Sequence, residues 1–132
     1  MNQSVCVIGL GYIGLPTAAL LSNKGFDVHG VDVVPKIVDI INSGEIHIIE
    51  PELDQYVKNG VSSKKLVAST NPTYADIFII AVPTPFHEGY RPNIDYVISA
   101  TKSIAPFIKE GNLIILESTS PVGTTDKIAQ EL

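Results

Sequence analysis

Short apolar runs alternate along the chain with longer stretches in which apolar residues recur at helical spacing. The runs are rich in Val and Ile and are bounded by polar residues, Gly or Pro, which is typical of strands. Strands and helices in regular alternation predict βα units and a parallel sheet. The run IFIIAV is nearly continuous, which is typical of a strand covered on both faces. The strands are expected at 5–8, 27–31, 66–69, 76–82 and 112–117.

The first helical stretch is expected over residues 12–24, directly after the first strand. Pro16 lies near its first turn, where a missing N–H costs least, although a helix starting at Tyr12 would still lose one bond there and be distorted. The apolar positions expected to face the sheet are Ile13, Ala18, Leu20 and Leu21.

The remaining helices complete the alternation. One is expected to begin near Pro35, a short one to end at Asn59 and Gly60, and a third to span about 94–108, with Thr124 capping a last one. Right-handed connections predict a Rossmann-type doubly wound α/β sheet of five strands in the order 3-2-1-4-5. Its switch point lies between the first and fourth strands, and ligands bind at the carboxyl ends of the strands there.

Length and composition indicate one globular domain over residues 1–132. The net charge of −5 argues against a nucleic-acid backbone as a partner. No apolar run is long enough for a membrane span or a signal peptide, so a cytoplasmic protein is expected. The single cysteine, Cys6, falls inside the first strand and is expected to be a buried thiol without a catalytic role.

The turn after the first strand carries the sequence GLGYIG, from Gly9 to Gly14. In a dinucleotide-binding turn, Gly9 allows the sharp change of direction, Gly11 lets the backbone approach a pyrophosphate, and Gly14 permits close helix packing. The phosphates then lie at a helix N-terminus, which favours negative charge.

An acidic residue, Asp32, follows the second strand. A carboxylate there can accept hydrogen bonds from both ribose hydroxyls of the cofactor and would repel a 2′-phosphate. The prediction is therefore an NAD site rather than an NADP site. The alternative is a purely structural βα turn with Asp32 as a solvated strand end.

Two further strand ends carry unusual segments. The fourth strand leads into AVPTPF, where two prolines stiffen the backbone around Val82 and Thr84. The fifth strand leads into ESTSPVG, which presents adjacent hydroxyls, Thr119 among them. Such hydroxyls can bind a cofactor, a substrate or an ordered water but are weak acid–base groups alone. Ordinary turn chemistry is the alternative for either segment.

These motifs together resemble the N-terminal domain of the UDP-glucose/GDP-mannose dehydrogenase family. The resemblance rests on GLGYIGLPTA, Asp32, EIHIIEP, AVPTPF and ESTSPVGTT, in this order, over nearly the whole chain. It implies an NAD-dependent oxidation of a nucleotide sugar at its C6 alcohol, with two NAD per product. The wording of EIHIIEP, AVPTPF and ILESTSPVG is most similar to members that oxidise UDP-N-acetyl-D-mannosamine to the uronate, with UDP-glucose as the alternative substrate.

The resemblance also implies roles for individual residues. Backbone N–H groups of Tyr12 and Ile13 would meet the pyrophosphate, and Val82 would lie at the cofactor. Thr84 and Thr119 would lie on the nicotinamide side, with Thr119 also positioning substrate or water. No residue of the chain matches the family's nucleophilic cysteine, so the chain is expected to be a fragment that binds NAD weakly and turns over no sugar. The full-length protein is expected to bind the UDP-sugar and to form a homodimer.

Other interpretations use different residues or none. A regulatory NAD-sensing module would need no catalytic groups, but it has no evident use for AVPTPF and ESTSPVG. Dehydrogenases of 3-hydroxy acids or 6-phosphogluconate share the architecture but not these loops. His29, His47 and His87 lack metal-ligand spacing. Glu50 and Glu52 are expected to be surface or loop-anchoring groups.

Overall fold

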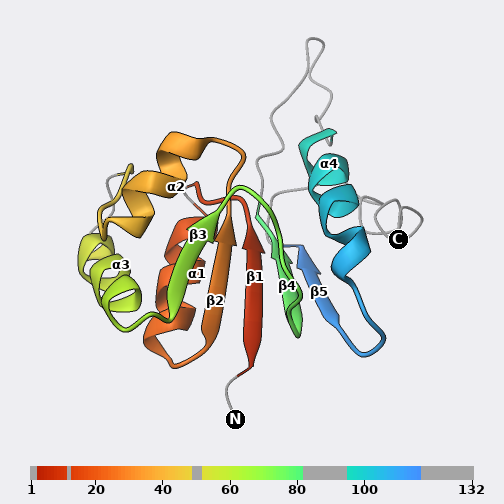
Figure 1. The fold of residues 1–132 in the computed structure, drawn as a ribbon, viewed down its shortest axis with the longest axis horizontal. Coiled ribbons are helices and arrows are strands. Elements are labelled where there is room, and N and C mark those ends of the chain that lie inside the picture. Colours follow the sequence, from red (N-terminus) through yellow and green to blue (C-terminus); the bar gives the residue numbers. More distant parts are fainter. Residues whose placement is uncertain (1–2, 12, 49–51, 82–94, 117–132) are drawn as a thin grey trace.

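A parallel sheet forms the centre of the molecule, with helices on both faces (Figure 1). The computed structural model describes residues 3–11, 13–48, 52–81 and 95–116. Five strands run in the order β3-β2-β1-β4-β5, which confirms the predicted topology. The strands are β1 (Ser4–Ile8), β2 (Asp27–Val31), β3 (Leu66–Ser69), β4 (Ile77–Ile80) and β5 (Leu113–Leu116).

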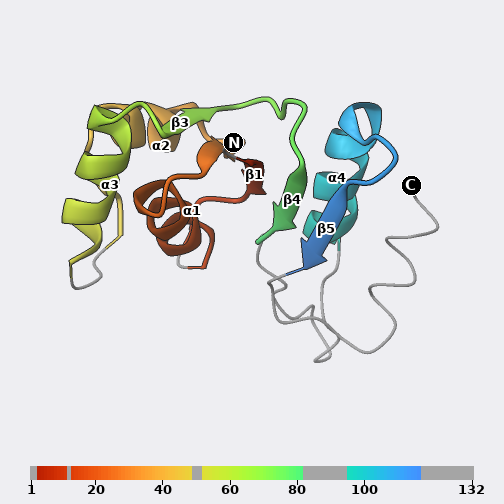
Figure 2. The ribbon, with the colours of Figure 1, turned by 90° about the horizontal axis from the view of Figure 1, so that it is seen from below.

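The helices divide between the two faces of the sheet (Figure 2). On one face lie α1 (Gly14–Asn23), α2 (Pro35–Asn42) and α3 (Leu53–Ser62). On the other lies α4 (Asp95–Ile104), which is followed by the short 3₁₀ helix η1 (Ala105–Phe107). The helix expected over 94–108 is therefore α-helical only to Ile104.

Successive side chains of the central strand β1 enter two separate cores, because a strand alternates faces. Val5 and Val7 pack with the residues of α1, α2 and α3. Cys6 and Ile8 pack on the opposite face with Phe78 and the residues of α4. Burial on both faces explains why β1 and β4 appear in the sequence as continuous apolar runs.

Helix α1 differs from the prediction in its start and in its buried face. It begins at Gly14 rather than at Tyr12, which places Pro16 inside the first turn, where proline is best tolerated. Ile13 and Leu20, expected to face the sheet, are 40% and 46% exposed. The buried face instead follows the 3–4 spacing Leu15, Ala18, Ala19 and Ser22.

Helix α3 continues to Ser62 rather than ending at Asn59 and Gly60 as expected. Gly60 has a packing role inside the helix. A Cβ at Gly60 would lie 2.3 Å from the Ser22 hydroxyl oxygen and 3.1 Å from the Cβ of Leu66. Glycine at this position therefore lets α3 approach α1 and β3 closely.

Candidate functional site

The glycine turn lies between the end of β1 and the start of α1. Gly9 has a φ of 98°, in the region that L-residues other than glycine rarely adopt. Its N–H donates to the Val31 carbonyl at 2.7 Å, which ties the turn to the end of β2. A side chain at Gly9 would therefore strain the turn at its sharpest point.

Gly14 and Gly11 differ in what surrounds them. A Cβ on Gly14 would lie 1.7 Å from the Gly9 carbonyl oxygen and 3.2 Å from the Cβ of Ala81, which follows β4. A Cβ on Gly11 would meet nothing within 4 Å. Gly14 thus permits close packing of helix and turn, while the backbone at Gly11 is open to an incoming group.

The first turn of α1 carries no acidic side chain of its own. Its N-cap residue, Ile13, makes no side-chain cap hydrogen bond, and no acidic residue occupies the first turn. The partial positive charge of a helix N-terminus is therefore not neutralised by the helix itself. An anion at this position would find a favourable field.

Asp32 follows the end of β2, and two backbone groups hold its carboxylate. One oxygen accepts a hydrogen bond from the Leu10 N–H at 3.1 Å, and the other accepts from the Val34 N–H at 3.0 Å. A carboxylate oxygen can accept more than one hydrogen bond, so each can also receive a ligand hydroxyl. The structure thus links the acidic residue directly to the glycine turn through Leu10.

A cavity of about 540 Å³ lies over this turn and contains both features. Its walls come from the carboxyl ends of β1 and β2, from the segment after β3, and from α4. Most of the described lining residues are apolar, and Asp32 is the charged one among them. The lining residues are Ile8, Gly9, Leu10, Gly11, Val31, Asp32, Val33, Val34, Thr70, Pro72, Ala81, Ser99, Ala100 and Ser103.

The family model that matches this chain is the UDP-glucose/GDP-mannose dehydrogenase family, NAD binding domain, over residues 3–132. The chain belongs to this family. NAD is accordingly the cofactor of the domain, and the open backbone at Gly11, the uncapped start of α1 and the oriented Asp32 carboxylate fit it. The site residues named from the sequence stay predictions in their individual roles.

Relatives with a stated activity match nearly all of the chain. The chain is 58% identical to a UDP-N-acetyl-D-mannosamine dehydrogenase of Campylobacter jejuni, covering 100% of this chain and 33% of that protein. It is 55% identical to the Escherichia coli K12 protein of the same name, covering 98% and 31%. The chain thus spans about a third of the length of these relatives.

Solved structures agree with the fold. The UDP-N-acetyl-mannosamine dehydrogenase Cap5O of Staphylococcus aureus superimposes with a TM-score of 0.92 and 43% identity, covering 96% of this chain and 31% of that one. A 3-hydroxyisobutyrate dehydrogenase of Mycobacterium tuberculosis matches with a TM-score of 0.65 and 19% identity, which shows a shared fold alone.

Several predicted site residues of the family domain lie outside the described residues. They are Tyr12, Val82, Thr84 and Thr119, and the same holds for Glu50, His87 and Thr124. Of the predicted cofactor residues, the structure brings together Gly9, Gly11, Gly14 and Asp32. Ile13 stands beside them as the N-cap of α1.

Sequence reasoning missed two walls of the cavity. Thr70 and Pro72 come from the connection between β3 and β4, and Ser99 and Ser103 come from α4. The spacing of the two serines, four positions apart, places both on one helix face and was a usable signal. The contribution of residues 70 and 72 depends on long-range packing and had no local signature.

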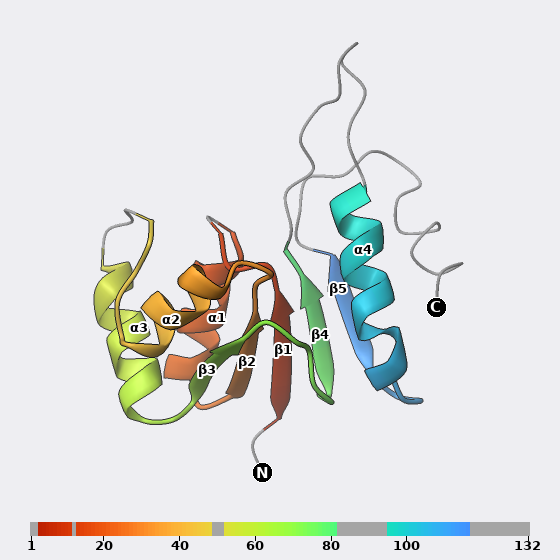
Figure 3. The ribbon, with the colours of Figure 1, turned by 45° about the horizontal axis from the view of Figure 1, so that its top comes forward.

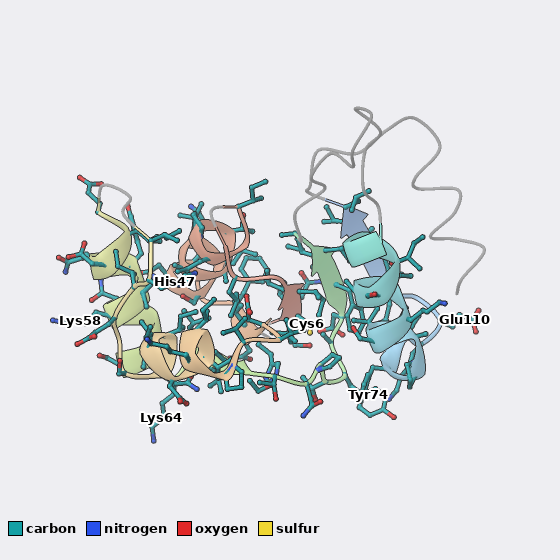
Figure 4. The ribbon with its side chains drawn as sticks, turned by 90° about the horizontal axis from the view of Figure 1, so that it is seen from above. Cys6, His47, Lys58, Lys64, Tyr74 and Glu110 are labelled. Atoms are coloured by element: carbon teal, nitrogen blue, oxygen red, sulfur yellow. The ribbon has the colours of Figure 1, made fainter. Side chains whose placement is uncertain are left out.

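Cys6 is fully buried, as predicted. Its thiol is expected to be unreactive. Desolvation raises the pKa of its thiol to about 11, and a backbone hydrogen bond with Thr73 offsets only part of this increase. A thiol with this pKa carries almost no thiolate at neutral pH. Figure 4 places Cys6 within the body of the molecule, with Lys58, Lys64 and Glu110 at its margins.

No other residues form an evident second centre within the described part of the chain. No group of three potential metal ligands is found among the described residues. None of the described helices is long and apolar enough to cross a membrane. Glu52 is exposed and occupies the N-cap position of α3 with a φ of 65°.

Proposed function

We propose that this chain is the cofactor-binding part of a nucleotide-sugar 6-dehydrogenase whose substrate is UDP-N-acetyl-D-mannosamine. The full-length protein would oxidise the C6 alcohol to the carboxylate of UDP-N-acetyl-D-mannosaminuronate. This is a four-electron oxidation in which water supplies the second carboxylate oxygen and two NAD accept one hydride each. The observation that supports it most is the glycine turn joined to Asp32, in a chain 55–58% identical to UDP-N-acetyl-D-mannosamine dehydrogenases.

The glycine turn is the proposed seat of the pyrophosphate. The phosphates would lie over the uncapped start of α1, beside the open backbone of Gly11. Backbone N–H groups of Tyr12 and Ile13 would donate to them. Gly9 and Gly14 would not bind the phosphates directly but would maintain the shape of the turn.

Asp32 is proposed to bind the adenosine ribose and to select NAD over NADP. Its carboxylate is already oriented by Leu10 and Val34, so little conformational freedom is lost when the ribose hydroxyls bind. A 2′-phosphate at the same position would meet the carboxylate charge, and the described residues that line the cavity include no cationic side chain.

Thr84 and Thr119 are proposed to lie on the nicotinamide side, with Val82 beside them. What supports this is that β4 and β5 pair in parallel, so the two strands end at the same edge of the sheet, and that Ala81, directly after β4, lines the cavity. Thr119 is further proposed to position the substrate or a water molecule. Thr119→Val in the full-length protein is expected to lower kcat with little change in NAD affinity.

The covalent chemistry on the sugar is proposed to use residues that this chain does not contain. By resemblance to the family, a cysteine thiolate captures the aldehyde between the two oxidations. The chain has one cysteine, and that thiol is buried in the sheet. We therefore expect the 132-residue chain alone to bind NAD weakly and to produce no NADH.

The substrate assignment is tested with the full-length protein by following NADH formation. UDP-N-acetyl-D-mannosamine is expected to give a much higher kcat/KM than UDP-glucose. Equal activity on both sugars would overturn the substrate preference. NAD binding without activity on any nucleotide sugar would favour the regulatory, NAD-sensing alternative. We also expect the full-length protein to be a cytoplasmic homodimer without affinity for nucleic acid.

A further inference from the structure

The connection from β3 to β4, residues 70–76, crosses the sheet without forming a helix (Figure 3). It starts at the carboxyl end of β3 and reaches the amino end of β4. We call it the crossing segment. Its first part supplies Thr70 and Pro72 to the cavity, so its position decides the shape of one cavity wall.

The cavity end of the crossing segment is held by a histidine on β2. The Nε2 atom of His29 lies 2.7 Å from the Ser69 hydroxyl oxygen and 3.1 Å from the Asn71 carbonyl oxygen. The Ser69 hydroxyl is also 2.6 Å from the Asn71 carbonyl oxygen, and the Asn71 N–H donates to it at 3.3 Å. Three residues thus form one small network directly beside Thr70.

The acceptors in this network fix where the protons lie. The Asn71 carbonyl oxygen can only accept, so His29 bonds to it only through a protonated Nε2. In that tautomer the Ser69 hydroxyl donates to the Asn71 carbonyl and its oxygen accepts from Nε2–H. As an Nε2–H donor, His29 ties the end of β3 at Ser69 and the crossing segment at Asn71 to β2.

The opposite end of the crossing segment is fixed independently. Asp76 accepts hydrogen bonds from the Ser4 N–H at 3.0 Å and from the Ser4 hydroxyl at 3.1 Å. Tyr74 packs edge-on against Phe107 at 5.1 Å between ring centroids, and the Lys109 ammonium lies 4.6 Å from the Tyr74 ring. Loss of the His29 network would therefore free the half of the segment that lines the cavity and leave the other half in place.

We infer that His29 is a positioning residue for the adenosine end of the NAD site. This inference rests on the proposed placement of the pyrophosphate at the glycine turn and of the ribose at Asp32. The adenine then extends past Asp32 into the part of the cavity between Val33, which is 86% exposed, and the wall that holds Thr70 and Pro72. His29 keeps that wall in place through Ser69 and Asn71 without touching the cofactor.

The test measures binding of AMP, which occupies the adenosine end alone, and of NAD to the full-length protein by titration calorimetry. His29→Ala is expected to weaken binding of both by a similar factor, about three- to ten-fold, the range that the loss of about one net hydrogen bond supports. His29→Gln can place an amide N–H near the position of Nε2 and is expected to restore most of the affinity. His29→Asn places its amide nearer the backbone and is expected not to restore it.

Val67→Ala is the matched control. Val67 is the β3 residue in register with His29, is 48% exposed and does not line the cavity, so AMP and NAD binding should stay unchanged. Ser69→Ala supplies a second variant of the same network. Its effect combined with His29→Ala should be less than the sum of the two, because both remove the same contact.

Three results would overturn the inference. These are wild-type AMP binding in His29→Ala, an equal loss in Val67→Ala, and no recovery in His29→Gln with a wild-type unfolding temperature. The nucleotide-sugar activity is read separately, by NADH formation in the wild-type protein. A failure there would leave the AMP result intact.

Discussion

Gly14→Ala changes the cofactor turn at its most crowded point. The new Cβ would lie 1.7 Å from the Gly9 carbonyl oxygen, whereas Cβ contacts under 3.0 Å essentially do not occur. The turn or the start of α1 must therefore move by ~1.3 Å, the difference between these distances. Backbone atoms cannot rotate away as a flexible side chain can. We expect the upper part of the overpacking range, about 3 kcal/mol, reduced by about 1 kcal/mol because alanine favours the helix.

The net loss of about 2 kcal/mol corresponds to a fall in unfolding temperature of about 5–10 °C for a domain of this size. Calorimetry of the protein that carries this domain measures the fall in unfolding temperature. Titration with NAD should show weaker binding in the same variant. Gly11→Ala is the matched control, because its Cβ meets nothing within 4 Å. It should leave the unfolding temperature nearly unchanged and still weaken NAD binding, since the methyl group occupies the space of the pyrophosphate. An unchanged unfolding temperature and NAD affinity in Gly14→Ala would refute this reasoning.

Three further changes follow from contacts in the structure. Asp32→Asn removes a charged acceptor, so we expect the KM for NAD to rise at least about ten-fold and the use of NADP to improve. The exposed Asp39→Asn is the control and should change neither value. An unaltered preference for NAD over NADP in Asp32→Asn would contradict the role of Asp32. Asn42→Ala removes the amide that accepts from the N–H of Ala68 and donates to its carbonyl, on the outer edge of β3. We expect calorimetry to show about 1–2 kcal/mol lower stability and sedimentation to show concentration-dependent self-association. A monodisperse variant of wild-type stability would show that this edge needs no cover. Burial raises the pKa of the Cys6 thiol to about 11, so the thiol should resist a thiol reagent at pH 8 until the protein unfolds. Its contribution to stability is complete below about pH 9 and is lost as the pH rises through 11. Rapid labelling of the native protein would contradict this burial.

The central strands β1 and β4 were predictable because they are buried on both faces and therefore appear as apolar runs. The strand order was predictable because connections between parallel strands are right-handed. The boundaries of the helices were harder to predict than the strands. Glycine is a common helix stop signal, but Gly60 lies inside α3, where its lack of a side chain allows close approach to Ser22. The face of α1 was partly wrong because Leu20 is apolar yet lies opposite the buried stripe.

The candidate site also contains parts with a local sequence signature and parts that depend on long-range contacts. The glycine turn and Asp32 carry local signatures of backbone conformation and charge, and the structure joins them through the Leu10 N–H. The crossing segment and its contact with His29 arise from residues 40 and 42 positions apart, which no local pattern encodes. The serines of α4 fall between these cases, since their spacing was visible but their cavity was not.

The most direct measurement is the amount of NADH formed by the full-length protein from a limiting, known amount of UDP-N-acetyl-D-mannosamine with excess NAD. The proposed function predicts two NADH per sugar and a uronate product, because the alcohol passes through two oxidations. One NADH per sugar, or none from a protein that binds NAD, would contradict it.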